Sequence, residues 1–244
     1  MEKYFENRRI LVTGGCSGIG RGAVVELWRR GASVVALSNQ TEALHKLKHE
    51  YPSVEIVSVD LRDWDETRKV VDALGVFSGL VNCAGFIHNQ SFFDCLPNVF
   101  DETMQVNVKA ILNITQVVAK KMVENKIKGS IVNISSQASM AALKDHISYC
   151  TSKGALDAMT RVMALELGPF NIRVNTINPT VVMTELGRRA WADPEKANAM
   201  LSKIPLGRFG EVEDVVNAIV FLLSDSASMI HGVHLPVDGG FLAT

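Results

Sequence analysis

Two patterns of apolar residues alternate along this chain. Short runs rich in valine, isoleucine and leucine, typical of buried strands, occupy residues 9–13, 33–37, 54–59, 79–81, 129–134, 171–177 and 232–237. Between most of them, apolar residues recur at the spacing of amphipathic helices, over residues 21–30, from near Asp63, and over 97–126, 149–167 and 211–223. Continuous apolar strands that alternate with helices predict a parallel sheet covered by helices on both faces. We therefore expect one domain with a doubly wound, seven-stranded α/β fold.

A glycine-rich loop joins the first predicted strand to the first predicted helix, and its sequence is Gly14-Gly15-Cys16-Ser17-Gly18-Ile19-Gly20. Between a strand and a helix, such a loop can hold the pyrophosphate of a dinucleotide at the helix N-terminus. Gly14 suits the tight turn, Gly18 lets the phosphate approach backbone N–H groups, and Gly20 lets the helix pack on the strand. A plain turn would use the same glycines, but the flanking elements favour a Rossmann-type nucleotide site.

The end of the second predicted strand bears on the choice of cofactor. In dinucleotide folds this strand end meets the adenosine ribose, where an acidic residue accepts from the 2′-hydroxyl of NAD and an arginine accommodates the 2′-phosphate of NADP. This chain has neither, because Ser38, Asn39, Gln40 and Thr41 follow the strand. A missing carboxylate removes repulsion of a phosphate, and neutral donors remain. The pattern favours NADP(H) without excluding NAD(H).

Polar or small residues also follow the later strands. Asp60 could accept from an adenine amino group, or it could cap the helix that begins near Asp63. The small residues in the stretch 82–85 would let a ligand lie close to the backbone. Since the carboxyl ends of parallel strands share one edge of the sheet, one cleft should collect the glycine loop, Ser38, Asp60, Asn82, Ser136 and Asn178.

Tyr149 and Lys153 are four residues apart on a predicted helix, so both side chains should lie on one face. A nearby ammonium favours a phenolate and would lower the pKa of the tyrosine, which is ~10 in a free side chain. Tyr149 could then protonate a carbonyl oxygen that Ser136 holds by a hydrogen bond. A half-buried ring beside a solvated lysine would show the same spacing, so the pair gains weight only from the other features of the cleft.

Asn107 lies inside the predicted helix 97–126. Asparagine is an indifferent helix former, so this residue is either solvated or a polar group that serves the site. The helical pattern alone favours the solvated position.

Composition excludes several classes of partner. The chain has 244 residues and a net charge of −1, with acids and bases interspersed, which gives no basic surface for nucleic acid or membrane. No apolar stretch approaches the ~18 residues of a membrane span, and residues 1–9 lack the apolar core of a signal peptide. The four cysteines have neither zinc-site nor disulfide spacing. We expect a cytoplasmic protein with reduced thiols, no metal and a small-molecule partner.

In this order and spacing, the glycine loop after Thr13, residues 82–85, Asn107, Ser136, the Tyr149/Lys153 pair and Asn178-Pro179 resemble the short-chain dehydrogenase/reductase family over the whole chain. The resemblance implies a catalytic tetrad of Asn107, Ser136, Tyr149 and Lys153, and so replaces the solvated interpretation of Asn107. It implies a homotetramer, with the dinucleotide-binding part at about residues 1–135 and the catalytic and substrate-binding part at about 136–244. The implied cofactor contacts are Gly14, Ser17, Gly18, Ile19, Gly20, Ser38, Asn39, Asp60, Leu61, Asn82, Ala84, Gly85, Ile134, Tyr149, Lys153, Pro179, Val182 and Thr184.

Within that family the chain is most similar to reductases of L-xylulose and small α-dicarbonyls, on the stretches 162–169, 178–184, 204–207 and 235–241. This implies NADPH-dependent reduction of L-xylulose to xylitol. Those reductases carry two cations for the 2′-phosphate where this chain has Ser17 and Asn39, which leaves strict NADPH preference open. The alternatives are a 3-oxoacyl-thioester or steroid reductase, or a non-catalytic cofactor-binding scaffold or redox sensor, which a complete tetrad disfavours.

The substrate pocket is predicted from positions around the reacting groups. Gln137, Leu143 and His146 lie between Ser136 and Tyr149, so they should rim the carbonyl together with those two residues. Trp191 belongs to the segment 184–205, which could form a lid. His146 could instead be a solvated loop residue, and Trp191 a packing anchor.

Overall fold

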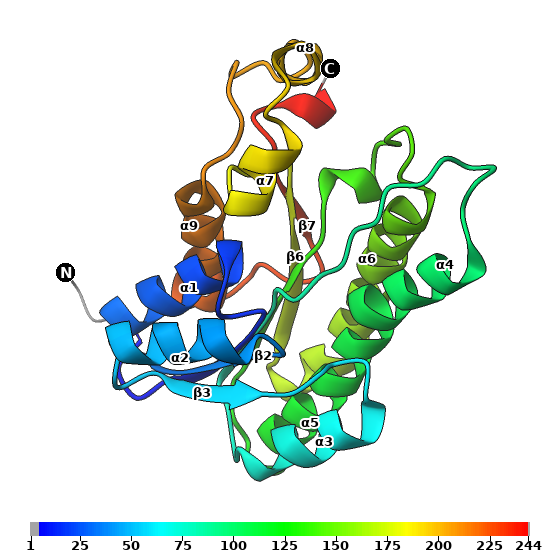
Figure 1. Ribbon diagram of the computed structural model, residues 1–244. Helices are drawn as coiled ribbons and strands as arrows, with labels where there is room; N and C mark the ends of the chain where they lie inside the picture. Colours follow the sequence, from blue (N-terminus) through cyan, green and yellow to red (C-terminus); the bar gives the residue numbers. More distant parts are fainter. Residues whose placement is uncertain (1–4, 244) are drawn as a thin grey trace.

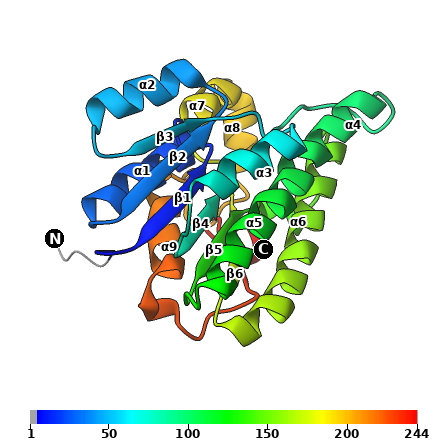
Figure 2. The same cartoon turned by 90° about the horizontal axis from the view of Figure 1, so that it is seen from below.

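All seven strands form one parallel sheet in the computed structural model, which describes residues 5–243. The strand order is β3-β2-β1-β4-β5-β6-β7 (Figure 1 and Figure 2). The strands are β1 (Arg9–Thr13), β2 (Ser33–Ser38), β3 (Glu55–Ser58), β4 (Gly79–Asn82), β5 (Ser130–Ile134), β6 (Arg173–Pro179) and β7 (His234–Val237). The predicted doubly wound α/β fold is confirmed. The order reverses beside β1, so the crevice for a ligand lies beyond the carboxyl ends of β1 and β4.

Helices cover both faces of the sheet. They are α1 (Gly18–Arg29), α2 (Thr41–Glu50), α3 (Trp64–Ala73), α4 (Pro97–Met104), α5 (Ala110–Glu124), α6 (Ile147–Leu167), α7 (Glu185–Ala190), α8 (Pro194–Leu201) and α9 (Val212–Leu223). Helices α1, α2 and α9 cover one face, and α3, α5 and α6 cover the other (Figure 2). Alternate residues of each strand feed the two cores: Val12 packs on the first face and Leu11 on the second.

The helix predicted over 97–126 contains an irregular turn. Between α4 and α5, the segment Gln105–Lys109 forms a π-helix, which accommodates one extra residue per turn. Such turns are rare and often coincide with functional sites, because they open the regular backbone ladder. This one contains Asn107.

Three helices have no counterpart in the apolar pattern of the sequence. Helix α2 buries only Leu44 and Leu47, and α7 has no buried residue. Helix α8 buries Met200 alone. Helices α7 and α8 occupy the segment expected to form a lid. So few core contacts leave too weak a periodicity to detect.

No helix within residues 5–243 is both long and apolar enough to cross a bilayer. The prediction about the N-terminus rests in part on residues 1–4, which lie outside the described residues.

Candidate active site

The glycine loop has the backbone conformation that its sequence predicts. Gly14 and Gly18 adopt positive φ angles of 64° and 50°, a region that favours glycine. A Cβ atom on Gly14 would lie 3.0 Å from the backbone N of Ala84. A Cβ on Gly20 would lie 2.2 Å from the carbonyl oxygen of Gly14. The loop, the end of β4 and the start of α1 therefore meet closely enough to require glycine, which fits a backbone cradle for phosphate.

Neutral groups surround the end of β2. Ser38 is buried, and its hydroxyl accepts from the backbone N of Gln40 at 3.2 Å and from Sγ of Cys16 at 3.1 Å. With two donors already directed at its oxygen, Ser38 can still donate its own proton. Ser17 and Asn39 are exposed. The contact between Cys16 and Ser38 was not predicted, because it joins residues far apart in the chain.

Asp60 is not the cap of the following helix. Asp63 caps α3, accepting from the backbone N of Glu66 at 2.9 Å, so the capping alternative for Asp60 is wrong. Asp60 instead accepts from the Arg62 guanidinium at 2.6 Å, and this contact lowers the pKa of the carboxyl group. Leu61, between them, is buried. A role of Asp60 toward adenine stays a prediction.

The loop after β4 lies over the predicted catalytic residues. The Thr13 hydroxyl accepts from the backbone N of Cys83 at 3.0 Å and of Ala84 at 3.1 Å. A Cβ on Gly85 would lie 3.7 Å from Oδ1 of Asn107 and 3.9 Å from Nζ of Lys153. These contacts hold the end of β1 and the loop after β4 next to the residues of the tetrad.

The side chain of Asn82 ties the sheet to its covering helix. Its amide nitrogen donates to Oδ1 of Asn133 at 2.8 Å and to the hydroxyl of Thr115 at 3.1 Å. Asn82 itself is buried. Its visible contacts are therefore structural, and its predicted contact with a cofactor stays a prediction.

Asn107 is fully buried, so the solvated position that the helical pattern favours is wrong. Its Oδ1 accepts from the backbone N of Phe86 at 2.7 Å, and its Nδ2 donates to the carbonyl of Phe86 at 2.8 Å. Nδ2 also donates to the hydroxyl of Ser152 at 2.9 Å, and that hydroxyl donates to the carbonyl of Tyr149. Asn107 thus joins the loop after β4 to the turn of α6 that carries Tyr149 and Lys153.

Lys153 lies beneath Tyr149 as the four-residue spacing predicts. Its Nζ is 5.6 Å from the centroid of the Tyr149 ring and donates to the carbonyl of Ile134 at 2.8 Å. Lys153 is buried, and burial lowers its pKa to about 8. Burial also raises the pKa of Tyr149, while its interaction with Ser136 acts the other way. The lowering of the Tyr149 pKa expected from spacing alone is therefore not seen, because burial outweighs the interaction that favours the phenolate.

Ser136 begins a short 3₁₀ turn of residues 137–139 at the end of β5. It is buried, and its hydroxyl accepts from the backbone N of Ala138 at 3.1 Å. The hydroxyl keeps its own proton as a donor, and it interacts with Tyr149. The turn thus presents a donor at the same strand end that receives Lys153.

The predicted substrate residues have different surroundings. Gln137 is buried, and its Oε1 has no hydrogen-bond partner among residues 5–243, whereas a position on the rim was expected. His146 is partly buried, 6.4 Å from the Tyr149 ring between centroids, so it does adjoin the site. Leu143 is also partly buried. Trp191 packs on Phe209 with 5.5 Å between the ring centroids, which is the arrangement of a packing anchor.

The remaining predicted cofactor residues lie at the ends of β1, β5 and β6. Ile134 and Pro179 are buried at the ends of β5 and β6, and Val182 is buried two residues before the N-cap of α7. That cap is Thr184, which accepts from the backbone N of Gly187 at 3.0 Å. A Cβ on Gly18 would lie 3.2 Å from Cγ2 of Thr184, so this residue flanks the glycine loop. Ile19 is partly buried in α1.

Comparison with known proteins identifies the class of this site. A family model described as enoyl-(acyl carrier protein) reductase matches residues 14–242. The chain belongs to the short-chain dehydrogenase/reductase family. It is an oxidoreductase that acts on hydroxyl and carbonyl groups.

The chain is similar to named enzymes over its full length. It is 51% identical to L-xylulose reductase of Mus musculus, covering 100% of both chains. It is 50% identical to D-erythrulose reductase of Gallus gallus, covering 98% of both.

Two solved structures share the fold, each with a TM-score of 0.94. One is a gluconate 5-dehydrogenase from Burkholderia cenocepacia in complex with NADP and tartrate, 27% identical, covering 100% of this chain and 98% of that one. The other is 4-hydroxyisoleucine dehydrogenase complexed with NADH, 30% identical, covering 98% of this chain and 100% of that one. The fold and the glycine loop together are those of a protein that uses a nicotinamide cofactor.

Proposed function

We propose that this enzyme reduces L-xylulose to xylitol and also reduces small α-dicarbonyls such as diacetyl, with NADPH as the hydride donor. The observation that carries the proposal is the 51% identity to an L-xylulose reductase along the entire chain, together with a complete tetrad. The buried, unpartnered Oε1 of Gln137 beside Ser136 suits a substrate that carries hydroxyl groups. Residues up to about 135 would hold the cofactor, and residues from about 136 onward would perform the chemistry.

The roles of the side chains follow from their contacts. When bound, the nicotinamide supplies a hydride to the carbonyl carbon. The Ser136 hydroxyl donates to the carbonyl oxygen, and Tyr149 gives that oxygen its proton as the negative charge develops. The ammonium of Lys153, beneath the ring, stabilises the phenolate that remains. The Asn107 amide donates both of its hydrogens and accepts one hydrogen bond at Oδ1, so a water that returns a proton to Lys153 could still donate to the second lone pair of Oδ1.

The predicted contacts of the cofactor fit the residues present. Gly14, Gly18 and Gly20 form the backbone cradle, and Ser38 offers a free proton next to a buried thiol. Val182 and Thr184 would adjoin the nicotinamide. These neutral groups give no charge to discriminate strongly between NADPH and NADH.

We predict that adding the two missing cations will increase the preference for NADPH. In the double variant Ser17→Lys, Asn39→Arg, a hydrogen bond from a cation to the 2′-phosphate is worth about 1.5–3 kcal/mol, roughly a 10- to 100-fold gain in kcat/KM. Initial rates with L-xylulose and diacetyl, each with NADPH and NADH, measure the effect. The NADH rates serve as the control because NADH lacks the phosphate. Equal gains with both cofactors would contradict the placement of the 2′-phosphate.

The rate should depend on the protonation of Lys153. Burial lowers its pKa to about 8, whereas an exposed lysine titrates near ~10.4. The phenolate is stabilised by the protonated form of Lys153 and not by the neutral amine. Activity should therefore be constant at lower pH and fall as the pH rises through about 8. The pH profile of kcat/KM for the cofactor reports on the free enzyme and tests this. A decline that begins only where exposed lysines titrate would contradict it.

The rival substrate class is a 3-oxoacyl thioester; the matching family model is likewise described by a thioester substrate, an enoyl-(acyl carrier protein). Turnover of an acetoacetyl thioester at a higher kcat/KM than L-xylulose would replace the present proposal.

Assembly and location are also part of the proposal. Apolar side chains remain exposed on α6 and just after it, at Val162, Leu165 and Phe170, which supports a homotetramer. The four cysteines are unpaired, as is usual in the reducing cytoplasm. Sedimentation at micromolar concentration would test the assembly.

A further inference from the structure

A second buried charge lies one helical turn beyond Lys153. Asp157 is 5% exposed on α6, and its Oδ2 accepts from Nδ2 of Asn178 at 3.0 Å. Within the part of the chain that the structure describes, its Oδ1 has no hydrogen-bond partner, and Nδ1 of His234 is 3.9 Å away. A buried carboxylate with a single hydrogen bond is costly, so stability alone would favour a neutral side chain at this position. The proposed reaction assigns Asp157 no role.

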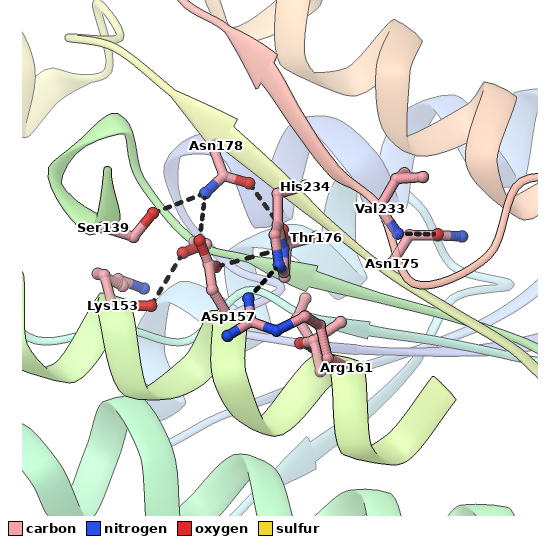
Figure 3. Close-up of polar contacts among 12 residues, drawn as sticks. Ser139, Lys153, Asp157, Arg161, Asn175, Thr176, Asn178, Val233 and His234 are labelled. Carbon is pink, nitrogen blue, oxygen red and sulfur yellow. Dashed lines mark hydrogen bonds and ion pairs between the residues drawn. The ribbon is translucent and has the colours of Figure 1, made fainter. Parts of the chain in front are cut away.

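Asn178 connects Asp157 to the turn that presents Ser136. The same Nδ2 lies 3.2 Å from the carbonyl oxygen of Ser136. It also lies 2.9 Å from the hydroxyl of Ser139, as Figure 3 shows. The Ser139 hydroxyl in turn donates to the Ser136 carbonyl at 2.8 Å. Helix α6, strand β6 and the turn after β5 therefore meet at one amide group.

A directional series of hydrogen bonds orients that amide. Arg161 can only donate, so Nε2 of His234, 2.7 Å away, accepts and the ring proton lies on Nδ1. Nδ1 then donates to the Thr176 hydroxyl at 2.9 Å, and this hydroxyl donates to Oδ1 of Asn178 at 2.7 Å. The NH₂ group of Asn178 must consequently face Asp157 and Ser136.

The charge of Asp157 also acts on the tetrad. Burial is the main influence on Lys153 and lowers its pKa, while the carboxylate of Asp157 acts in the opposite direction. Both residues lie on one face of α6. Asp157 is thus connected to Ser136 through Asn178, and its charge raises the pKa of Lys153 against the effect of burial.

We infer that Asp157 is a positioning residue for carbonyl reduction, which fixes the turn carrying the Ser136 hydroxyl through its contact with Asn178. The inference rests on the proposed function for its catalytic consequence, but the positioning itself does not require turnover. Loss of the carboxylate frees one hydrogen of the Asn178 amide to reorient. The turn after β5 then loses a fixed anchor.

The test compares Asp157→Ala with Asp157→Asn and with a matched control. Misplacement of a reacting group by about 1 Å can cost 10²-fold, so Asp157→Ala should lower kcat by roughly 10- to 100-fold. KM and the dissociation constant for NADPH should change little. Asp157→Asn keeps an acceptor for Asn178 and should recover most of the rate. An Asp157→Asn variant as slow as Asp157→Ala would overturn the inference.

Asn175→Ala is the control, because Asn175 in β6 is buried like Asp157 but donates to the carbonyl of Ile230. Its Oδ1 accepts from the backbone N of Val233 (Figure 3). This variant should lose stability without the fall in kcat. Equal kcat for Asn175→Ala and Asp157→Ala would overturn the inference. If Asp157→Ala does not fold, Asn178→Ala carries the same comparison.

Hydrogen exchange gives a readout that needs no substrate. The backbone N–H groups of Ala138 and Ser139 bond to Ser136, and those of Met140 and Ala141 bond to Gln137. Their exchange, followed by mass spectrometry, should be faster in Asp157→Ala and unchanged in Asn175→Ala. Unchanged exchange in Asp157→Ala overturns the inference. An inactive wild-type enzyme would overturn the proposed function alone, since the exchange comparison would still decide the positioning.

Discussion

Replacing Tyr149 with phenylalanine should abolish most of the reduction while leaving the protein folded and able to bind its cofactor. The hydroxyl is the proton donor of the ring whose centroid lies 5.6 Å from Nζ of Lys153, and acid catalysis contributes ~10²- to 10⁴-fold. We expect kcat to fall by at least that factor. The ring itself is retained, so packing against His146 should persist.

The measurement is single-turnover reduction of diacetyl, with NADPH binding followed by fluorescence quenching. His146→Phe is a suitable companion variant because it alters the neighbouring ring without removing the Tyr149 hydroxyl. A Tyr149→Phe enzyme that reduces diacetyl at near the wild-type rate would refute the role of Tyr149. Loss of NADPH binding in the same variant would show that its effect is on the cofactor site.

The second large effect should come from Gly20→Ala. The added methyl carbon would lie 2.2 Å from the carbonyl oxygen of Gly14 and 2.8 Å from its carbon. Both are backbone atoms, so the glycine loop would have to move away from α1. Overpacking of this kind costs about 1–3 kcal/mol or more, and the displaced loop should bind NADPH far more weakly.

Gly154→Ala provides the matched control. Gly154 lies inside α6, and the nearest atom to an added Cβ is the carbonyl oxygen of Ser139 at 4.0 Å. Alanine is a better helix former by about 1 kcal/mol, so this variant should be slightly more stable. Thermal unfolding and NADPH titration of both variants make the comparison. Normal NADPH affinity in Gly20→Ala would mean that the loop tolerates the overlap.

Local sequence predicted the features of the site that depend on strand ends and helical spacing. The glycine loop, Ser136 and the pair Tyr149 and Lys153 lie where the alternation of strands and helices places them. The positions of these residues follow from the periodicity of the sequence and from the rule that ligands bind beyond the carboxyl ends of parallel strands. The same rule predicted that Asn178 lies at the site.

What the sequence did not predict depends on contacts between distant segments. Asn107 is buried because it bonds Phe86 and Ser152, and nothing in its own helix signals either partner. Asp157 resembles any polar residue of an amphipathic helix until β6 is packed against it. The pKa of Tyr149 likewise depends on burial, which spacing does not reveal.

The geometry of the active site depends on the number of residues in the π-helix at Gln105–Lys109. A chain one residue shorter at this point could close an uninterrupted α-helix from Pro97 to Glu124, and such a helix satisfies its backbone more regularly. The deletion would remove the wide turn and shift the residues inside it by one position, about 100° around the helix axis. Asn107 would then face away from Phe86 and Ser152. A deletion that the helix tolerates would therefore disrupt the site. Substitutions in this segment should be accepted more readily than insertions or deletions.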